Sequence, residues 1–359
     1  MTAPKRGVPL DRSTNSNPSR SCSCFIAALT CALLCAMTLA ACGPPPREPV
    51  LAPTPPPPPP PPDEHTPPPV EQEPSAALSI LSEVGFLTPE SVVFDKRRDV
   101  YFVSNINGGP LDKDGNGFIS KVTPQGQLTL KFIDGSLEGI DLDAPKGMTI
   151  AGDILYVADI DSIRKFDAIS GKQLGSISVP GATFLNGLST GEKGKIYASD
   201  SGLNAQFART LTDAVYLIDG DEPKKIAAGK ALGSPNGLSA GPGGVWVTTF
   251  GSGELFWISD SGEKGKAERL PGGQNDGLVA TDEGELLISS WEKKAVYRRA
   301  KDGTFRVELG GIESPADIGY DCRRQRLMVP SFKENAVVFH DLTPAKAPSP
   351  DSTESAKAE

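Results

Sequence analysis

Five polar side chains and one alanine recur at matching positions along this 359-residue chain, about 40 residues apart. Two of them are carboxylates and two are amides, and these hard oxygens are the ligands that Ca²⁺ prefers. Two carboxylates would also balance the charge of one divalent ion. The lysine of the set would either repel a metal or bind the carboxylate of a substrate. The six positions are Glu90, Lys146, Asn186, Asn236, Asp276 and Ala316.

The elements that must position these residues are short β-strands in a repeated pattern. Each position lies in one of six similar segments, which read PESV, PKGM, LNGL, PNGL, NDGL and PADI. A second β-rich run follows each segment, then a third, and five of the six repeats have a fourth, more polar run. A period of about 40 residues is typical of four-stranded propeller blades. The sequence therefore predicts an all-β fold over 75–342, a six-bladed β-propeller with four-stranded antiparallel blades.

The two ends of the repeat region predict how the ring of blades closes. The sixth repeat lacks a fourth run, whereas residues 76–84 (AALSILSEV) precede the first repeat without a blade of their own. We expect this N-terminal strand to complete the last blade and remove an exposed sheet edge. Because the innermost strand of each blade starts beside the central channel, the six recurring positions should face that channel.

A purely structural interpretation of the recurring positions is also available. Asn-Gly and Asp-Gly pairs are favoured in turns for backbone reasons, so they would recur wherever a strand begins with a turn. This interpretation explains the glycines but does not explain Glu90.

The segments TPESVVFD, FLNGLS, SPNGLSA and NDGLVAT resemble the senescence marker protein/gluconolactonase/luciferin-regenerating-enzyme-like family of six-bladed propellers, and the resemblance covers about residues 85–342. It implies that Glu90, Asn236 and Asp276 hold a divalent metal, with Ca²⁺ as the expected ion. It places Asn186 at the substrate.

The activity implied by this resemblance is hydrolysis of a small lactone or ester. The metal would polarise the carbonyl and lower the pKa of a bound water, and Asp276 would relay the proton. Gluconolactonases of the family place an Arg two residues before the third-blade Asn and an Asp directly after it, where this chain has Phe184 and Gly187. We expect Lys146 and Asp200, which ends a second run, to contribute to substrate binding, although Asp200 could equally cap a turn.

Other chemistries are poorly supported by the sequence. The chain has two histidines, His65 and His340, so the repeat region offers no histidine metal site and no Ser-His-Asp triad. Residues 112–117 (DKDGNG) resemble the start of a calcium loop, but position twelve is Thr123 instead of Glu, which favours a polar hairpin loop. The three tryptophans at strand positions are expected to pack between blades. They are Trp246, Trp257 and Trp291.

The N-terminus has the organisation of a bacterial lipoprotein. Residues 1–41 combine a basic start with an apolar stretch and read as a signal peptide, which ends before Cys42 in the lipobox-like LAAC. Cys42 is the expected lipidation site. Residues 42–74 form a proline-rich stalk, which we expect to be extended, and residues 343–359 form a polar, disordered tail.

Charge and composition bound the partners. The formal net charge of -9 argues against a nucleic-acid partner, which would need a concentrated basic face. We expect a monomer at the cell envelope, on the outer membrane or cell surface, because Gly43 replaces the Asp that would resemble an inner-membrane retention signal. Two functions remain open: a metal-dependent lactonase at the channel, or a non-catalytic propeller similar to NHL-repeat modules that binds protein, peptide or glycan.

Overall fold

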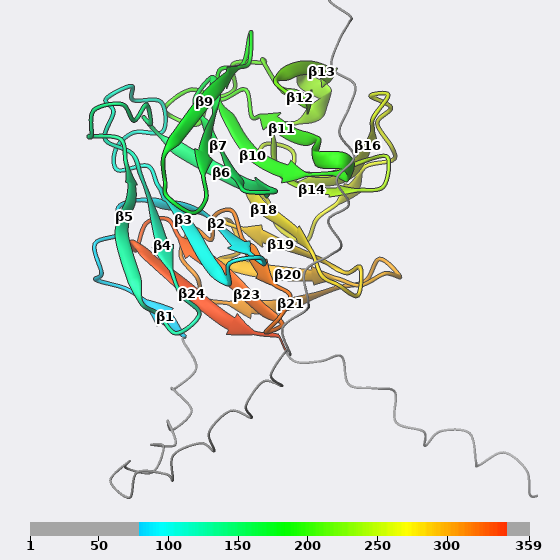
Figure 1. Ribbon diagram of the computed structural model, residues 1–359. Helices are drawn as coiled ribbons and strands as arrows, with labels where there is room; N and C mark the ends of the chain where they lie inside the picture. The colour runs from blue at the N-terminus through cyan, green and yellow to red at the C-terminus, as the bar shows by residue number, and fades with distance from the viewer. Residues whose placement is uncertain (1–78, 343–359) are drawn as a thin grey trace, which may run out of the picture. The chain divides into compact units, whose positions relative to one another are not determined.

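The computed structural model describes residues 79–342, which form six four-stranded antiparallel sheets arranged as the blades of a β-propeller (Figure 1). The predicted fold class and blade number are confirmed. The helical segments in this range are two single turns of 3₁₀ helix, Glu192–Gly194 and Lys230–Leu232. Residues 79–342 contain no helix with the length and apolar character needed to cross a membrane. The predicted signal peptide, the lipidation site Cys42, the stalk and the tail lie outside the described residues.

Five blades are built from four consecutive strands, in order from the channel outward. The first contains β2 (Pro89–Asp95), β3 (Val100–Asn105), β4 (Phe118–Val122) and β5 (Leu128–Asp134). The second contains β6 (Pro145–Ala151), β7 (Ile154–Asp159), β8 (Ser162–Asp167) and β9 (Gln173–Ser178). The third contains β10 (Leu185–Thr190), β11 (Ile196–Asp200), β12 (Ala214–Asp219) and β13 (Glu222–Ala228).

The fourth blade contains β14 (Pro235–Gly241), β15 (Gly244–Thr249), β16 (Glu254–Ser259) and β17 (Glu268–Arg269). The fifth contains β18 (Asn275–Ala280), β19 (Leu286–Ser290), β20 (Ala295–Arg299) and β21 (Phe305–Gly310). The sixth contains β22 (Gly319–Asp321), β23 (Arg326–Ser331) and β24 (Ala336–Asp341), with β1 (Ile80–Leu81) along its outer edge.

The sixth blade contains both ends of the described chain and lies beside the first blade. At its outer edge, Ile80 and Leu81 of β1 pair with Val338 and Val337 of β24. That this short strand closes the ring remains a prediction. Beside the channel, the N–H of Asp317 donates to the carbonyl of Glu90 at 2.8 Å, and the N–H of Val92 donates to the carbonyl of Asp317 at 3.2 Å. The inner strands of these two blades are therefore joined directly.

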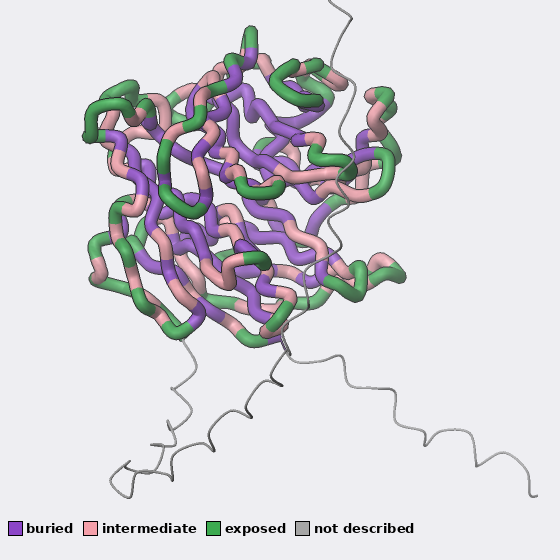
Figure 2. Tube along the Cα trace, viewed as in Figure 1, coloured by how far each residue is buried: buried purple, intermediate pink, exposed green. Residues whose placement is uncertain are grey.

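The hydrophobic core lies between neighbouring blades, so that each blade packs on the next. One cluster joins Phe102 of the first blade to Leu155 of the second, and another joins Ile163 of the second to Leu188 of the third. Figure 2 shows the consequence, because the inner strands are buried while the loops and outer strands are exposed. Burial of apolar surface at every blade interface holds the inner strands around one channel.

Candidate functional site

A β-bulge positions five of the six recurring residues at the mouth of the channel. In β2, Pro89 pairs with Asn105 and Val92 pairs with Val103, so one extra residue lies between the two pairs. The same shift occurs in β6, β10, β14 and β18. A bulge leaves residues unpaired and turns a side chain away from the regular alternation of a strand. It therefore directs Glu90 and its counterparts toward the channel.

Four of the six recurring residues are followed by a glycine, which allows a close approach of strands and does not form a turn. A Cβ on Gly147, Gly187, Gly237 or Gly277 would lie within 3.0 Å of backbone atoms of the next blade. None of these glycines has a positive φ. The interpretation of the Asn-Gly and Asp-Gly pairs as turns is thus wrong. The glycines allow neighbouring inner strands to approach each other closely.

Serine hydroxyls from the second strands hold adjacent bulges together. Ser199 in β11 accepts a hydrogen bond from the N–H of Gly187 at 2.9 Å and donates to the carbonyl of Asn236 in the next blade at 2.6 Å. Ser289 in β19 repeats this arrangement with Gly277 and Ala316. The position of each bulge is thus tied to that of its neighbour.

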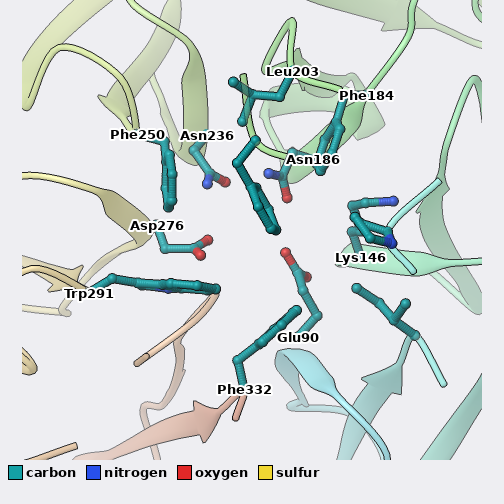
Figure 3. A pocket seen from close by; sticks show the side chains of 13 residues that line it. Glu90, Lys146, Phe184, Asn186, Leu203, Asn236, Phe250, Asp276, Trp291 and Phe332 are labelled. Carbon is teal, nitrogen blue, oxygen red and sulfur yellow. The ribbon is translucent and has the colours of Figure 1, made fainter. Parts of the chain in front are cut away.

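Four side-chain oxygens at the channel mouth are buried and have no hydrogen-bond partner among the described residues. They are Oε2 of Glu90, Oδ1 of Asn186, Oδ1 of Asn236 and Oδ1 of Asp276. Figure 3 shows these four side chains, each from a different blade, directed toward a common space. Leaving a buried polar atom unpaired costs about 1 to 3 kcal/mol, so four such atoms facing one space indicate a ligand.

The amide of Asn186 is oriented by its neighbours. Its Nδ2 donates to Oγ of Ser201 at 3.2 Å, and Ser201 donates in turn to the carbonyl of Pro235 at 2.8 Å. Since the nitrogen is held on this side, the amide oxygen is left for the channel.

We call Glu90, Asn186, Asn236 and Asp276 the ring. Burial and like charges shift its two carboxylates toward the protonated form. Burial raises the pKa of Glu90 well above its usual value, and the charges of Asp276 and Asp317 raise it further. Burial also raises the pKa of Asp276, to which Asp317 adds, whereas Trp291 and Asn236 oppose the shift. A cation between the two carboxylates would reverse the shift by favouring their charged forms.

Lys146 is buried beside the ring but forms no ion pair with a carboxylate within the described range. Its Nζ donates to the carbonyl of Ala144 at 3.0 Å and lies 4.9 Å from the centre of the Phe184 ring. Burial lowers the pKa of Lys146 to about 8, although the charge of Glu90 partly opposes this shift. The lysine therefore leaves Glu90 free for another partner.

Aromatic side chains enclose the space above the ring (Figure 3). Trp291 contacts Phe250 of the fourth blade and Phe332 of the sixth, and it also lines this cavity, which the sequence did not predict. Trp246 packs between the fourth and fifth blades, as expected, and pairs with Trp257 across β15 and β16. The aromatic residues of the wall are Phe184, Phe207, Phe250, Trp291 and Phe332.

The repeat pattern contained a signal for part of this wall. The residue directly after the second strand of a blade contributes to the cavity in four blades, and these residues are Ile106, Phe250, Trp291 and Phe332. The alignment of repeats would have identified them as equivalent. Phe207 lies in a loop outside the repeats, and no sequence signal identified it.

Asp200, near the site, has structural partners instead. Asp200 accepts hydrogen bonds from the N–H groups of Thr183, Phe184 and Gly202, each at 3.0 Å, and does not line the cavity. This is the capping role that the sequence had left open, and a role of Asp200 in substrate binding stays a prediction.

The donor set fits a divalent cation of the Ca²⁺ type. Two carboxylates and two amide oxygens are hard ligands, and the four orphaned oxygens lie around one cavity. Residues 79–342 contain no cluster of three or more His, Cys, Asp or Glu side chains in metal-binding geometry. An ion at the ring would therefore depend on the amide oxygens of Asn186 and Asn236 as well as on the carboxylates.

Comparison with solved structures confirms the architecture. A gluconolactonase from Xanthomonas campestris has a TM-score of 0.57 at 18% identity, covering 74% of this chain and 89% of that one. The calcium-binding protein regucalcin from Agrobacterium tumefaciens has a TM-score of 0.55 at 17% identity, covering 74% and 94%. A streptogramin B lyase has a TM-score of 0.52 at 11% identity, covering 75% and 99%. The sequence matches no family model and no curated protein. Likeness at these identities establishes a shared propeller fold.

Proposed function

We propose that this propeller hydrolyses a small lactone or ester at the mouth of its channel, with a divalent ion, Ca²⁺ by its donor chemistry, at the ring. One observation carries the proposal: the buried, unpartnered oxygens of Glu90, Asn186, Asn236 and Asp276 surround a single cavity. The gluconolactonase and regucalcin among the structural neighbours support it.

Each side chain of the ring has a distinct part in this proposal. A bound divalent ion would act as a Lewis acid on the carbonyl of the scissile ester bond. Glu90, Asn236 and Asp276 hold the ion, and Asn186 positions the substrate. The carboxylate of Asp276 also accepts the proton of the attacking water, as a general base. Lys146 adds positive charge that favours the negative charge developing on the carbonyl oxygen.

The alternative of a non-catalytic binding propeller predicts that Lys146 neutralises the ring. A salt bridge from Lys146 to Glu90 or Asp276 would fill the channel and leave no site for a metal. The amine instead donates to the carbonyl of Ala144. This contact favours the hydrolase.

We further propose that the domain is held at the cell envelope, on the outer membrane or cell surface, through lipid on Cys42. The sequence support is the apolar leader, the LAAC motif and the proline-rich segment that follows it. Labelling with a radioactive fatty acid tests the proposal, since Cys42→Ala should abolish incorporation and Cys322→Ala should not. Label retained in Cys42→Ala would contradict it.

The test of the metal site is calorimetric titration of Ca²⁺ into the chelator-treated full-length chain. We expect one site with a dissociation constant in the micromolar to millimolar range. Asp276→Ala should abolish the binding heat and the hydrolysis of a lactone panel together, because this residue both holds the ion and accepts the proton.

Asp114→Ala is the matched control. Asp114 lies in the acidic 112–117 loop, the other candidate calcium site in the sequence, and its carboxylate accepts from Asn116. This variant should bind Ca²⁺ as the unaltered chain does. Binding lost in Asp114→Ala but kept in Asp276→Ala would move the ion away from the ring, and no binding in any of the three proteins would overturn the proposal.

A further inference from the structure

The cavity above the ring is polar at its floor and apolar in its walls. Every polar side chain at the floor belongs to the ring or is Lys146. The wall residues are aliphatic or aromatic. The aromatic rings contact one another, with 5.6 Å between the centres of Phe250 and Trp291 and 5.1 Å between Trp291 and Phe332.

Phe207 reaches this wall from the loop between β11 and β12. Leu203 and Arg209 form an isolated antiparallel bridge, so the loop is a small hairpin with Phe207 near its tip. Within the hairpin, the side-chain oxygen of Asn204 accepts the N–H groups of Gln206 and Ala208, both at 3.0 Å. Phe207 itself has a φ of 58°, a conformation that several other loop residues of the domain share.

The Phe207 ring occupies the centre of the aromatic wall. Its centre lies 6.2 Å from Phe184, 6.0 Å from Phe250 and 6.2 Å from Trp291. Between these rings and the floor, the cavity has room for about one water molecule. A ligand as large as a lactone must therefore displace a wall side chain. Phe207 is the one to move, since it is 38% exposed whereas Phe184 and Phe250 are buried.

We infer that the substrate carries an apolar alkyl or aryl group, and that Phe207 fills the place of this group until the hairpin opens. The inference rests on the proposed function for the nature of the reacting bond. The apolar subsite and the gating hairpin follow from the wall itself.

A polyhydroxylated substrate fits this wall poorly. Each sugar hydroxyl would exchange its hydrogen bonds to water for contact with Phe250, Trp291 or Phe332, and an unpaired buried hydroxyl is unfavourable. An alkyl or aryl group loses no hydrogen bonds and gains the burial that Phe207 provides in the closed hairpin.

The first experiment compares two six-membered lactones that differ in their substituents. Hydrolysis of δ-decalactone, which bears a pentyl group, and of glucono-δ-lactone, which bears hydroxyls, is measured with the Ca²⁺-loaded full-length chain. We expect kcat/KM to be at least tenfold higher for δ-decalactone. A higher value for glucono-δ-lactone would overturn the inference while upholding the proposed function.

The second experiment measures binding without catalysis. The lactam that corresponds to δ-decalactone resists hydrolysis, and its binding should change the emission of Trp291 in the cavity wall. Phe207→Ala removes the ring that competes for the subsite, so the dissociation constant of the lactam should fall about 5- to 30-fold, the range expected when a closed state of moderate stability is removed. Leu211→Ala, at an exposed residue of the same loop outside the cavity, should bind as the unaltered chain does. Trp291→Phe should lose the emission change.

The outcomes separate the two proposals. Tighter lactam binding in Phe207→Ala alone supports the gate, whether or not any lactone is hydrolysed. Lactam binding without Ca²⁺ binding or lactone hydrolysis would support the apolar subsite and overturn the proposed lactonase function. Unchanged or weaker lactam binding in Phe207→Ala, or absence of binding to every variant, would overturn the gate.

Discussion

Buried charges inside the blades and buried charges at the ring have very different surroundings. Asp159, at the end of β7, is fully buried, but it accepts hydrogen bonds from Nε of Arg164 and from the N–H of Ala144, both at 2.8 Å. Glu90 and Asp276, also buried, each keep an oxygen without a partner. Within one domain, the blade carboxylate Asp159 is thus paired, whereas the ring carboxylates keep unpaired oxygens.

The sixth blade shows that pairing is well within the capacity of this fold. Asp321 is fully buried and receives the Tyr101 hydroxyl and Nη1 of Arg324, both at 2.7 Å. Asp213 is a further buried carboxylate of the blades whose Oδ1 is unpaired within residues 79–342, but Arg209 binds its other oxygen. The ring differs because four unpaired oxygens face one cavity. This contrast agrees with the proposed cation site, because unpaired buried oxygens lower stability and a bound ion would satisfy them.

Breaking the hydrogen-bonded ion pair of Asp159 and Arg164 inside a blade should have the largest effect on stability. Asp159→Ala removes the acceptor of Nε of Arg164 and of the N–H groups of Asp143 and Ala144, although Arg164 keeps ion pairs with Asp141 and Asp143. Because several buried donors lose their acceptor at once, we expect the free energy of unfolding to fall by about 3 to 5 kcal/mol. Urea denaturation followed by circular dichroism measures the change. Asp159→Asn, which keeps an acceptor but not the charge, should lose less. A loss below about 1 kcal/mol in Asp159→Ala would remove the contrast with the ring, because unpaired groups cost about that much or more.

Supplying the missing partner should stabilise the ring. Ca²⁺ at a hundred times its dissociation constant is expected to raise the free energy of unfolding by about 2.7 kcal/mol relative to chelator, because the ion binds the folded state. Denaturation with and without Ca²⁺ measures the gain. Glu90→Gln should lose most of it, whereas Asp114→Ala should retain it, and equal gains in both variants would argue against the ring as the site.

In the absence of metal, removing one negative charge from the ring should stabilise the folded protein. Asp276→Asn keeps the shape of the side chain but ends its repulsion with Glu90 and Asp317. We expect the variant to be more stable than the unaltered chain by about 1 to 2 kcal/mol in chelator at pH 8, while its lactone hydrolysis is lost. Urea denaturation in chelator and a hydrolysis assay provide the two readouts. Destabilisation by the substitution would show that the carboxylate has a structural partner.

The smallest effect concerns pH. The pKa values of Glu90 and Asp276 are raised in the fold, so their contribution to stability is full below the unfolded pKa of about 4 and is lost as the pH rises through the folded values. In chelator, the stability advantage of Asp276→Asn should therefore grow from about zero near pH 4 toward pH 8. Denaturation midpoints measured across this range check the trend, and an advantage that shrinks with rising pH would contradict it.

The sequence predicted the parts of this structure that repeat. Apolar alternation and regular spacing identified six blades, and the channel position of Glu90, Asn186, Asn236 and Asp276 followed from the register of the repeats. Strand periodicity carries this information because burial on a blade face imposes it on every repeat. The metal and catalytic roles of these residues stay predictions.

The parts that depend on three-dimensional proximity were not accessible in the same way. The bulge at Glu90 is a one-residue shift between two strands, which a single strand pattern does not reveal. The place of Phe207 depends on how the loop after β11 folds back over the ring. The partners of Asp200 are backbone N–H groups, and their positions cannot be predicted from residue types.

The close approach of the inner strands makes the spacing of the blades independent of the residues that would carry out the chemistry. Gly147, Gly187, Gly237 and Gly277 set the distance from one blade to the next, and this spacing does not depend on the side chains that face the channel. A new activity in such a domain would need substitutions at the six channel positions, with loop lengths and strand register kept.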